Sequence, residues 1–257
     1  MVYRYDGSFA GFLSCVFLSF ARKETPDQIL PPEESPLLGG KWVETRQDHA
    51  RRVEMGLRRK LGEEIWADIR DGYLSCLPGK EGILLRVIQR LFQSGRRAIT
   101  DYRDPDAAAL QKALVMMRQE GHLLEGFLRF SDYSGVLVAV IHPKNGVLPR
   151  LAVHFSTRFP QEKFVIYDET HHLAFFHSPT ERKFAEIDAL TLPPPDQTER
   201  LYRALWKGFL SALSIREREN PRCQMTHLPL RYRPWMVEFD REEPTDLSGF
   251  ALPEGQK

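Results

Sequence analysis

The fold is decided by one stretch, residues 120–177, which reads EGHLLEGFLRFSDYSGVLVAVIHPKNGVLPRLAVHFSTRFPQEKFVIYDETHHLAFFH. Its hydrophobic period changes three times. The first two apolar segments, residues 122–130 and 135–142, are rich in β-branched and aromatic residues. They flank the turn-like sequence SDYSG, a pattern that predicts an antiparallel hairpin.

After the loop sequence PKNG, apolar side chains in residues 147–159 recur every four positions, which indicates one face of a helix. Residues 163–169 and 171–177 then predict two more short strands around a turn. The whole stretch therefore predicts a small, mostly antiparallel sheet with a helix across one face.

The N-terminal part predicts two strands, at residues 1–7 and 41–45, each followed by a helix. Ser8 is expected to cap the first of these helices, and the second is expected to begin at Thr45 or Asp48. A strand–helix–loop–strand–helix order allows the two strands to pair in parallel. Three amphipathic helices should follow, at residues 62–77, 82–95 and 104–121, the last capped by Asp104.

A long helix is predicted at residues 198–220, with Trp206 and Phe209 packed onto the central sheet. The expected fold class is α+β: a helical and α/β N-terminal half, a small sheet crossed by a helix, and a long C-terminal helix. Residues 1–238 are expected to form a single compact body, with an internal boundary, if there is one, near residue 119. Residues 239–257 are expected to be a flexible acidic tail.

The composition, 42% hydrophobic and 28% charged, is that of an ordinary soluble globular protein, so we expect a cytoplasmic chain. The apolar segment at residues 9–21 is too short to span a bilayer, and no membrane partner is expected. The three cysteines are far apart, and the neighbouring His171 and His172 fit no standard metal spacing. Neither a metal nor another cofactor is therefore predicted, and no nucleotide-binding motif is present.

The formal charge of +1 hides an uneven distribution. Residues 237–257 carry a net charge of −4, so the remainder carries +5. A basic body points weakly to a polyanionic ligand. Arginines and a lysine also gather between residues 51 and 103, either as solvated helix faces or as a surface that follows a phosphate backbone.

Two sets of side chains are candidates for a site. His154 and Arg158 are one helical turn apart, so they point the same way, and that pair suits an anion with a proton donor beside it. A catalytic group would be made of these two residues with His122 and Asp168; the alternative is a helix with a packed His and a surface Arg. The second set would contact single-stranded nucleic acid with cations and an aromatic ring, and consists of Arg216, Arg218, Arg222, Arg231, Arg233 and Trp235.

Several segments also resemble a known family: YRYDGSFAGFLSCVF, HLLEGFLRF, PKNGVLPRLAVHFSTRFP, FVIYDE, and LYRALWKGFLSALSIRERENPR with MTHLPLRYRPWMVE. They are similar, in this order, to a bacterial domain-of-unknown-function family labelled probable DNA metabolism protein. Its members are linked with a radical-SAM protein thought to modify or repair DNA, and some are fused to a uracil-DNA glycosylase-like domain. The resemblance implies a DNA-related role but supplies no catalytic residues.

A uracil-DNA glycosylase-like domain is not expected within residues 1–257, and glycosylase chemistry is therefore not expected either. The chain also lacks the cysteine triad of a radical-SAM cluster, so any radical step would belong to a partner. Three functions stay open: a nucleic-acid-binding accessory protein that acts with a radical-SAM partner on DNA, an enzyme that acts on nucleic acid through a His/Arg site, and a protein scaffold that does not touch DNA. The oligomeric state is left open as well.

Overall fold

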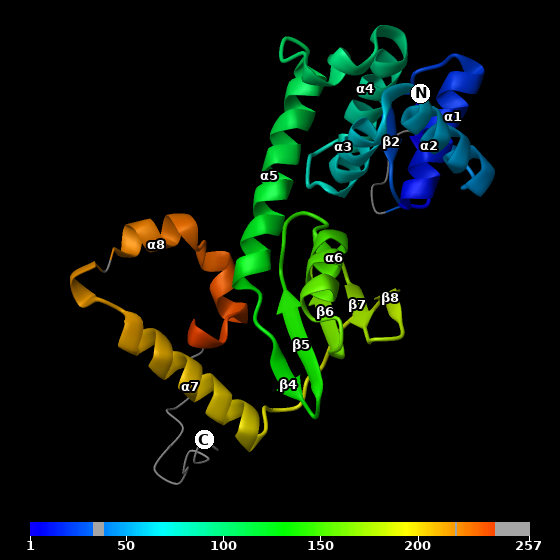
Figure 1. The fold of residues 1–257 in the computed structure, drawn as a ribbon. Coiled ribbons are helices and arrows are strands. Elements are labelled where there is room, and N and C mark those ends of the chain that lie inside the picture. Colours follow the sequence, from blue (N-terminus) through cyan, green and yellow to red (C-terminus); the bar gives the residue numbers. More distant parts are fainter. Residues whose placement is uncertain (33–38, 219, 240–257) are drawn as a thin grey trace. The chain divides into compact units, whose positions relative to one another are not determined.

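The computed structural model describes residues 1–32, 39–218 and 220–239, drawn in Figure 1, and confirms an α+β fold. Its contacts divide the chain into two compact units. Unit 1 contains residues 1–119 and 144–146, and unit 2 contains the remaining described residues. The single body of residues 1–238 stays a prediction, and the acidic tail lies outside the described residues apart from Phe239.

Unit 1 begins with a parallel three-stranded sheet in the order β2-β1-β3. The strands are β1 (Val2–Arg4), β2 (Gln28–Leu30) and β3 (Lys41–Trp42), and helix α1 (Phe9–Arg22) links the first two. Ser8 caps α1 through an Oγ that accepts a hydrogen bond from the Gly11 amide at 3.0 Å. The expected cap and the parallel pairing are both confirmed.

Helices build the rest of unit 1 around a core that includes Tyr3, Phe12, Leu57, Ile69 and Leu84. They are α2 (Gln47–Leu61), α3 (Glu63–Leu74), α4 (Lys80–Ser94), the short η1 (Arg96–Thr100) and the first part of α5 (Pro105–Phe127). Asp104 caps α5 as expected: its Oδ1 accepts hydrogen bonds from the amides of Asp106 and Ala107.

Unit 2 contains a five-stranded sheet in the order β4-β5-β6-β7-β8, visible in green and yellow in Figure 1. The strands are β4 (Ser131–Tyr133), β5 (Val136–Ile141), β6 (Phe164–Asp168), β7 (Leu173–His177) and β8 (Arg182–Glu186). Strands β5 and β6 are parallel and are joined by α6 (Leu148–Arg158), while the other neighbours are antiparallel. The predicted helix after PKNG and the two strands after it are confirmed.

The predicted strand at residues 122–130 is wrong, because α5 continues to Phe127. Buried apolar residues continue the helical spacing of α5 past Met117, at Leu124 and Leu128. The helix therefore extends into a segment whose composition alone favours a strand. The hairpin is displaced to β4 and β5, and the face assigned to His122 from strand alternation does not apply.

The long C-terminal helix is α7 (Gln197–Leu213), but the expected packing of Phe209 on the sheet is also wrong. Phe209 is 53% exposed, and its ring stacks on the half-buried Trp206. The helix instead attaches through the face that carries Glu199 and Arg203. Short helical segments follow: η2 (Arg216–Arg218), α8 (Pro221–His227), η3 (Leu230–Trp235) and η4 (Val237–Phe239).

Most of the arginines between α2 and α5 are already paired with acids. Arg86 Nη2 lies 2.7 Å from Asp106 Oδ1, and Arg90 bonds both Asp104 and Asp106. Arg96 pairs with Glu64 and Arg103 with Asp101. The hydrogen bond from Arg86 lowers the pKa of Asp106 to about 2, against the opposite effect of partial burial. These contacts favour ion-paired helix faces over a phosphate-binding surface in this region.

We expect Ser8→Ala to lower the free energy of unfolding by roughly 1 kcal/mol, since it removes the cap of α1. Gly7 has a φ of 81°, and a Cβ there would lie 3.3 Å from Pro32. Gly7→Ala should therefore cost more than Ser8→Ala. Urea denaturation of the two variants tests the order, and equal midpoints for both variants and the wild type would contradict it.

Asp106→Asn should lower the free energy of unfolding by about 1.5–3 kcal/mol at neutral pH, since a charge-assisted bond is lost. Because folding lowers this pKa from 3.8 to about 2, the stabilisation is present above the unfolded value and disappears as the pH falls toward 2. Denaturant midpoints at neutral pH and near pH 2 measure the difference. Asp101→Asn, which breaks only the pair with the exposed Arg103, is the control and should change little. An Asp106 effect that is independent of pH would contradict the assignment.

Candidate functional site

Two of the predicted catalytic histidines lie around one carboxylate, Glu125 of α5. His122 Nδ1 is 3.4 Å from Glu125 Oε2, and Arg150 Nε donates to Glu125 Oε1 at 2.8 Å. Burial acts to raise the pKa of Glu125, but the hydrogen bond and the charge of Arg150, with the hydrogen bond of His122 and the electrostatic effect of His154, lower it overall. His122 and His154, from α5 and α6, are therefore brought together in a surface ion-pair cluster.

The other two predicted catalytic residues lie elsewhere in unit 2. Arg158 is exposed in the last turn of α6, with its guanidinium 5.6 Å from the centre of the Phe159 ring. Asp168 is the last residue of β6 and is buried. Arg158 lies one turn after His154 on α6, but the contacts of Arg158 and Asp168 among the described residues do not include Glu125. The catalytic role of the four residues stays a prediction.

Asp168 holds the turn between β6 and β7 and orients a histidine that the sequence did not single out as a site residue. Its Oδ1 accepts hydrogen bonds from the amides of Thr170 and His171, both at 3.1 Å. Its Oδ2 lies 2.7 Å from His171 Nδ1, and the side chains are 1% and 35% exposed. When Asp168 is ionised, Nδ1 carries the proton and Nε2 is the free acceptor of the ring. The spacing Asp-x-x-His across a tight turn was the signal that could have identified this pair.

A second histidine–acid pair lies at the same edge of the sheet. Strands β5 and β6 end together, with Ile141 opposite Asp168. His142 Nδ1 is 3.4 Å from Glu169 Oε2, and the His142 ring stacks on Trp235 at 6.5 Å between centroids. The carboxyl ends of parallel strands commonly carry ligand sites, so this edge combines titratable groups with an aromatic surface.

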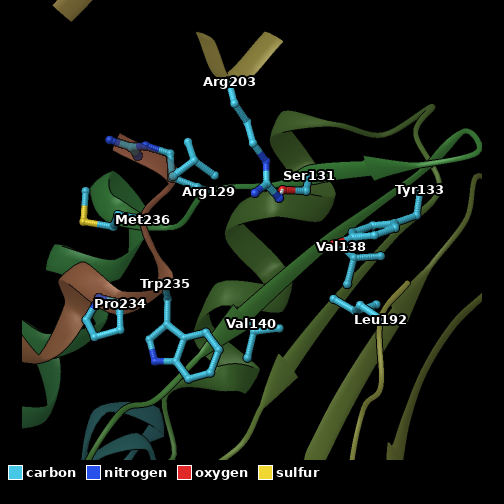
Figure 2. Close-up of a pocket in the computed structure, with 11 residues that line it drawn as sticks. Arg129, Ser131, Tyr133, Val138, Val140, Leu192, Arg203, Pro234, Trp235 and Met236 are labelled. Carbon is cyan, nitrogen blue, oxygen red and sulfur yellow. Dashed lines mark hydrogen bonds between the residues drawn. The ribbon is translucent and has the colours of Figure 1, made fainter. Parts of the chain in front are cut away.

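Trp235 also lines a pocket of about 160 Å³ that is contained entirely in unit 2 (Figure 2). Val138 and Val140 of β5 supply an apolar surface, and the Trp235 ring lies close to Val140 in the view. The polar part holds two arginines and a serine. The remaining wall comes from β4, the segment before α7, and the C-terminal residues: Tyr133, Leu192, Pro234, Met236 and Val237.

Both arginines of the pocket are fixed by carboxylates. Arg203 Nε donates to Glu199 Oε1 and its Nη2 to Ser131 Oγ, each at 2.8 Å. Arg129 Nη2 donates to Glu238 Oε1 at 2.9 Å, and its guanidinium lies 5.5 Å from the centre of the Trp206 ring. These pairs give the pocket rigid donors whose charge is largely compensated. The Arg129 Nε is buried and has no hydrogen-bond acceptor among the described residues.

The predicted nucleic-acid contacts divide into arginines that contact another described side chain and arginines that do not. Arg231 Nη2 donates to Glu120 Oε1 at 2.9 Å, and Arg233 lies over the Phe239 ring at 4.8 Å. Arg218 and Arg222 are exposed and have no ion pair with another described residue. The side chain of Arg216 lies outside the described part of the chain. Arg218 and Arg222, with Trp235, are therefore the members of the predicted set that are open to a ligand.

No group of three or more His, Cys, Asp or Glu side chains among the described residues is arranged to hold a metal ion. Within the same residues, the helices are all too short or too polar to cross a bilayer.

Comparison with known proteins gives one family. Neither a curated protein nor a solved structure matches the chain. A family model described as a domain of unknown function, DUF4130, matches residues 78–238, which is more than half of the chain and includes the pocket and the strand edge described above. The chain therefore belongs to the DUF4130 family.

Proposed function

We propose that unit 2 binds single-stranded nucleic acid and that the chain is an accessory protein in DNA metabolism or repair. The observation that carries this proposal is the position of Trp235. Trp235 is 37% exposed and lines the pocket, and its ring stacks on His142. An aromatic face open to solvent beside a cavity suits a nucleobase that has left its stack.

The pocket supports contact with one base at a time. Stacking of a base on an aromatic side chain contributes about 1–3 kcal/mol and requires no particular sequence. The apolar surface of Val138 and Val140 would receive the edge of the base, and Arg129 and Arg203, each held by a carboxylate, would form the polar wall beside it. Because both guanidiniums are already held by acids, they would fix the orientation of a base more than they would attract phosphate.

Attraction of the phosphate backbone falls to Arg218 and Arg222. They are exposed, and no acid among the described residues neutralises them. Each such contact releases condensed counterions when nucleic acid binds, so the affinity should fall with salt concentration. The radical-SAM partner belongs to this proposal as well: the resemblance supplies it, and any radical chemistry would be the partner's.

The test is fluorescence anisotropy with a labelled single strand of roughly 16 nucleotides, a typical upper site size for one module. Trp235→Ala should weaken binding about tenfold or more at every salt concentration, since a stacking surface is lost. The double variant Arg218→Ala, Arg222→Ala should weaken binding and reduce the salt slope by about 0.7–1 unit for each lost contact.

Matched controls exist in unit 1 and on α6. Trp42 is 56% exposed, and Arg51 and Arg59 are exposed on α2, so Trp42→Ala and the double variant Arg51→Ala, Arg59→Ala should keep wild-type binding. Arg158→Ala should also change little. If the control variants weaken binding as much as the test variants, unit 2 is not the interface. Wild-type binding that is negligible at low salt would end the nucleic-acid proposal.

A second candidate function is acid–base catalysis on nucleic acid, which the Asp168–His171 pair favours. A buried carboxylate that holds Nδ1 of a partly exposed imidazole leaves Nε2 able to take a proton and stabilises the imidazolium that forms. The base in this candidate is His171, whereas the sequence pointed to His154. Asp168 would position that base without touching the substrate.

His171→Ala should lower turnover of labelled DNA or RNA strands by about 10²–10⁴-fold. Asp168→Asn should lower turnover as well and shift its pH profile, because the amide oxygen can keep the turn while the amide nitrogen cannot accept the Nδ1 proton. His172→Asn is the control; its φ of 52° is one that Asn tolerates. Wild-type protein that binds strands but never converts them would eliminate the enzyme and leave the binding proposal intact.

A further inference from the structure

Helix α7 presents an apolar face to solvent. Tyr202, Leu205, Phe209 and Leu213 are 60%, 43%, 53% and 64% exposed. Their spacing of three, four and four residues places them in one row along the helix. Monomeric proteins normally expose single apolar residues that are scattered over the surface. A continuous row of four large apolar side chains exceeds that.

The row is not needed to hold α7 in place. The helix is attached through the neighbouring face, where the buried Glu199 accepts hydrogen bonds from Arg203 and from the amide of Asp132. Arg203 then reaches Ser131 of β4, and Trp206 is half-buried next to Arg129. A polar anchor thus fixes the helix to unit 2. Apart from the stacking of Phe209 on Trp206 of the same helix, the apolar row has no ring contact with another described residue.

A second row, of small residues, runs beside the first. Ala204, Gly208 and Ala212 recur every four positions, and a Cβ built on Gly208 would meet no atom within 4 Å. The large side chains of one helix can therefore enter the space over the small residues of another. Arg200 lies one turn before Ala204, at the start of the small row, and Lys207 lies on the flank of that row away from the large side chains. The middle of the contact, around Gly208 and Phe209, is therefore uncharged.

We propose that this face binds the same face of a second copy of the chain and forms a twofold dimer through paired α7 helices. A surface with adjacent large and small rows, and with charge only at its Arg200 end, is complementary to itself, which is what an isologous interface requires. The exposed area of the two rows is roughly 500 Å² per copy, or about 1,000 Å² for the pair, which reaches the lower limit of a specific interface. The proposal is independent of nucleic-acid binding.

Sedimentation velocity of the full chain from about 1 to 100 μM should show a monomer–dimer equilibrium with a micromolar Kd, as expected for an interface of that size. Phe209→Asp should weaken it at least about thirty-fold, since a central aromatic anchor is replaced by a charge. Val153→Asp is the matched control, because Val153 is 70% exposed on α6. It should leave the equilibrium unchanged.

Gly208→Leu separates close helix packing from unspecific adhesion. The new side chain adds apolar surface and meets nothing within the protomer, so unspecific association would become stronger. If α7 pairs closely with α7 of a second copy, the same side chain would force the two helices apart and weaken the dimer at least about tenfold. Unfolding midpoints confirm that each variant is folded. A wild type that stays monomeric up to about 100 μM, or a dimer indifferent to Phe209→Asp, would overturn the proposal.

Discussion

The arrangement of the C-terminal part of unit 2 depends on one buried carboxylate, that of Glu120. It is 3% exposed and accepts hydrogen bonds from Arg231 and from the hydroxyl of Tyr232, which lie more than a hundred residues away in the sequence. A buried carboxylate without such partners would be strongly destabilising, so the pairing fixes η3 against the end of α5. Burial raises the pKa of Tyr232 to about 12, so the phenol remains a donor across the physiological range. Trp235, three residues further on, takes its place over β5 as a consequence.

Sequence reasoning succeeded where the determinants are local. The cap of α1 by Ser8, the cap of α5 by Asp104, and the period of α6 all depend on residues within a few positions of each other. It failed where a tertiary contact or the length of an element decided the outcome. Residues 122–127 have strand-like composition, yet they continue a helix that began at Pro105. The face of α7 that turns inward is set by Glu199, whose partners on β4 are invisible in the helical pattern.

At the candidate site, too, local features are predictable from the sequence and contacts between distant residues are not. The sequence groups Asp168 of the predicted strand 163–169 with His154 and Arg158, but its partner lies in the following turn, at His171. Arg231 was assigned to nucleic acid because it lies in a basic, aromatic segment, although its guanidinium is committed to Glu120. Composition shows that a cation is present; only the structure shows whether that cation is already neutralised. Pairings between distant residues of this kind cannot be read from spacing.

Whether each cation is already paired with an acid matters more for function than the net charge does. The many arginines of α4, η1 and the segment before α5 look like a polyanion site in sequence, but Arg86, Arg90, Arg96 and Arg103 each have an acid within 3.0 Å. Binding phosphate there would require those pairs to be broken or shared, which offsets most of the Coulombic gain. Near α8 the cations are fewer and lack such competitors among the described residues, and an exposed indole lies in the same unit. A small number of uncompensated charges beside an aromatic surface is a better basis for binding a flexible strand than a larger number of compensated ones.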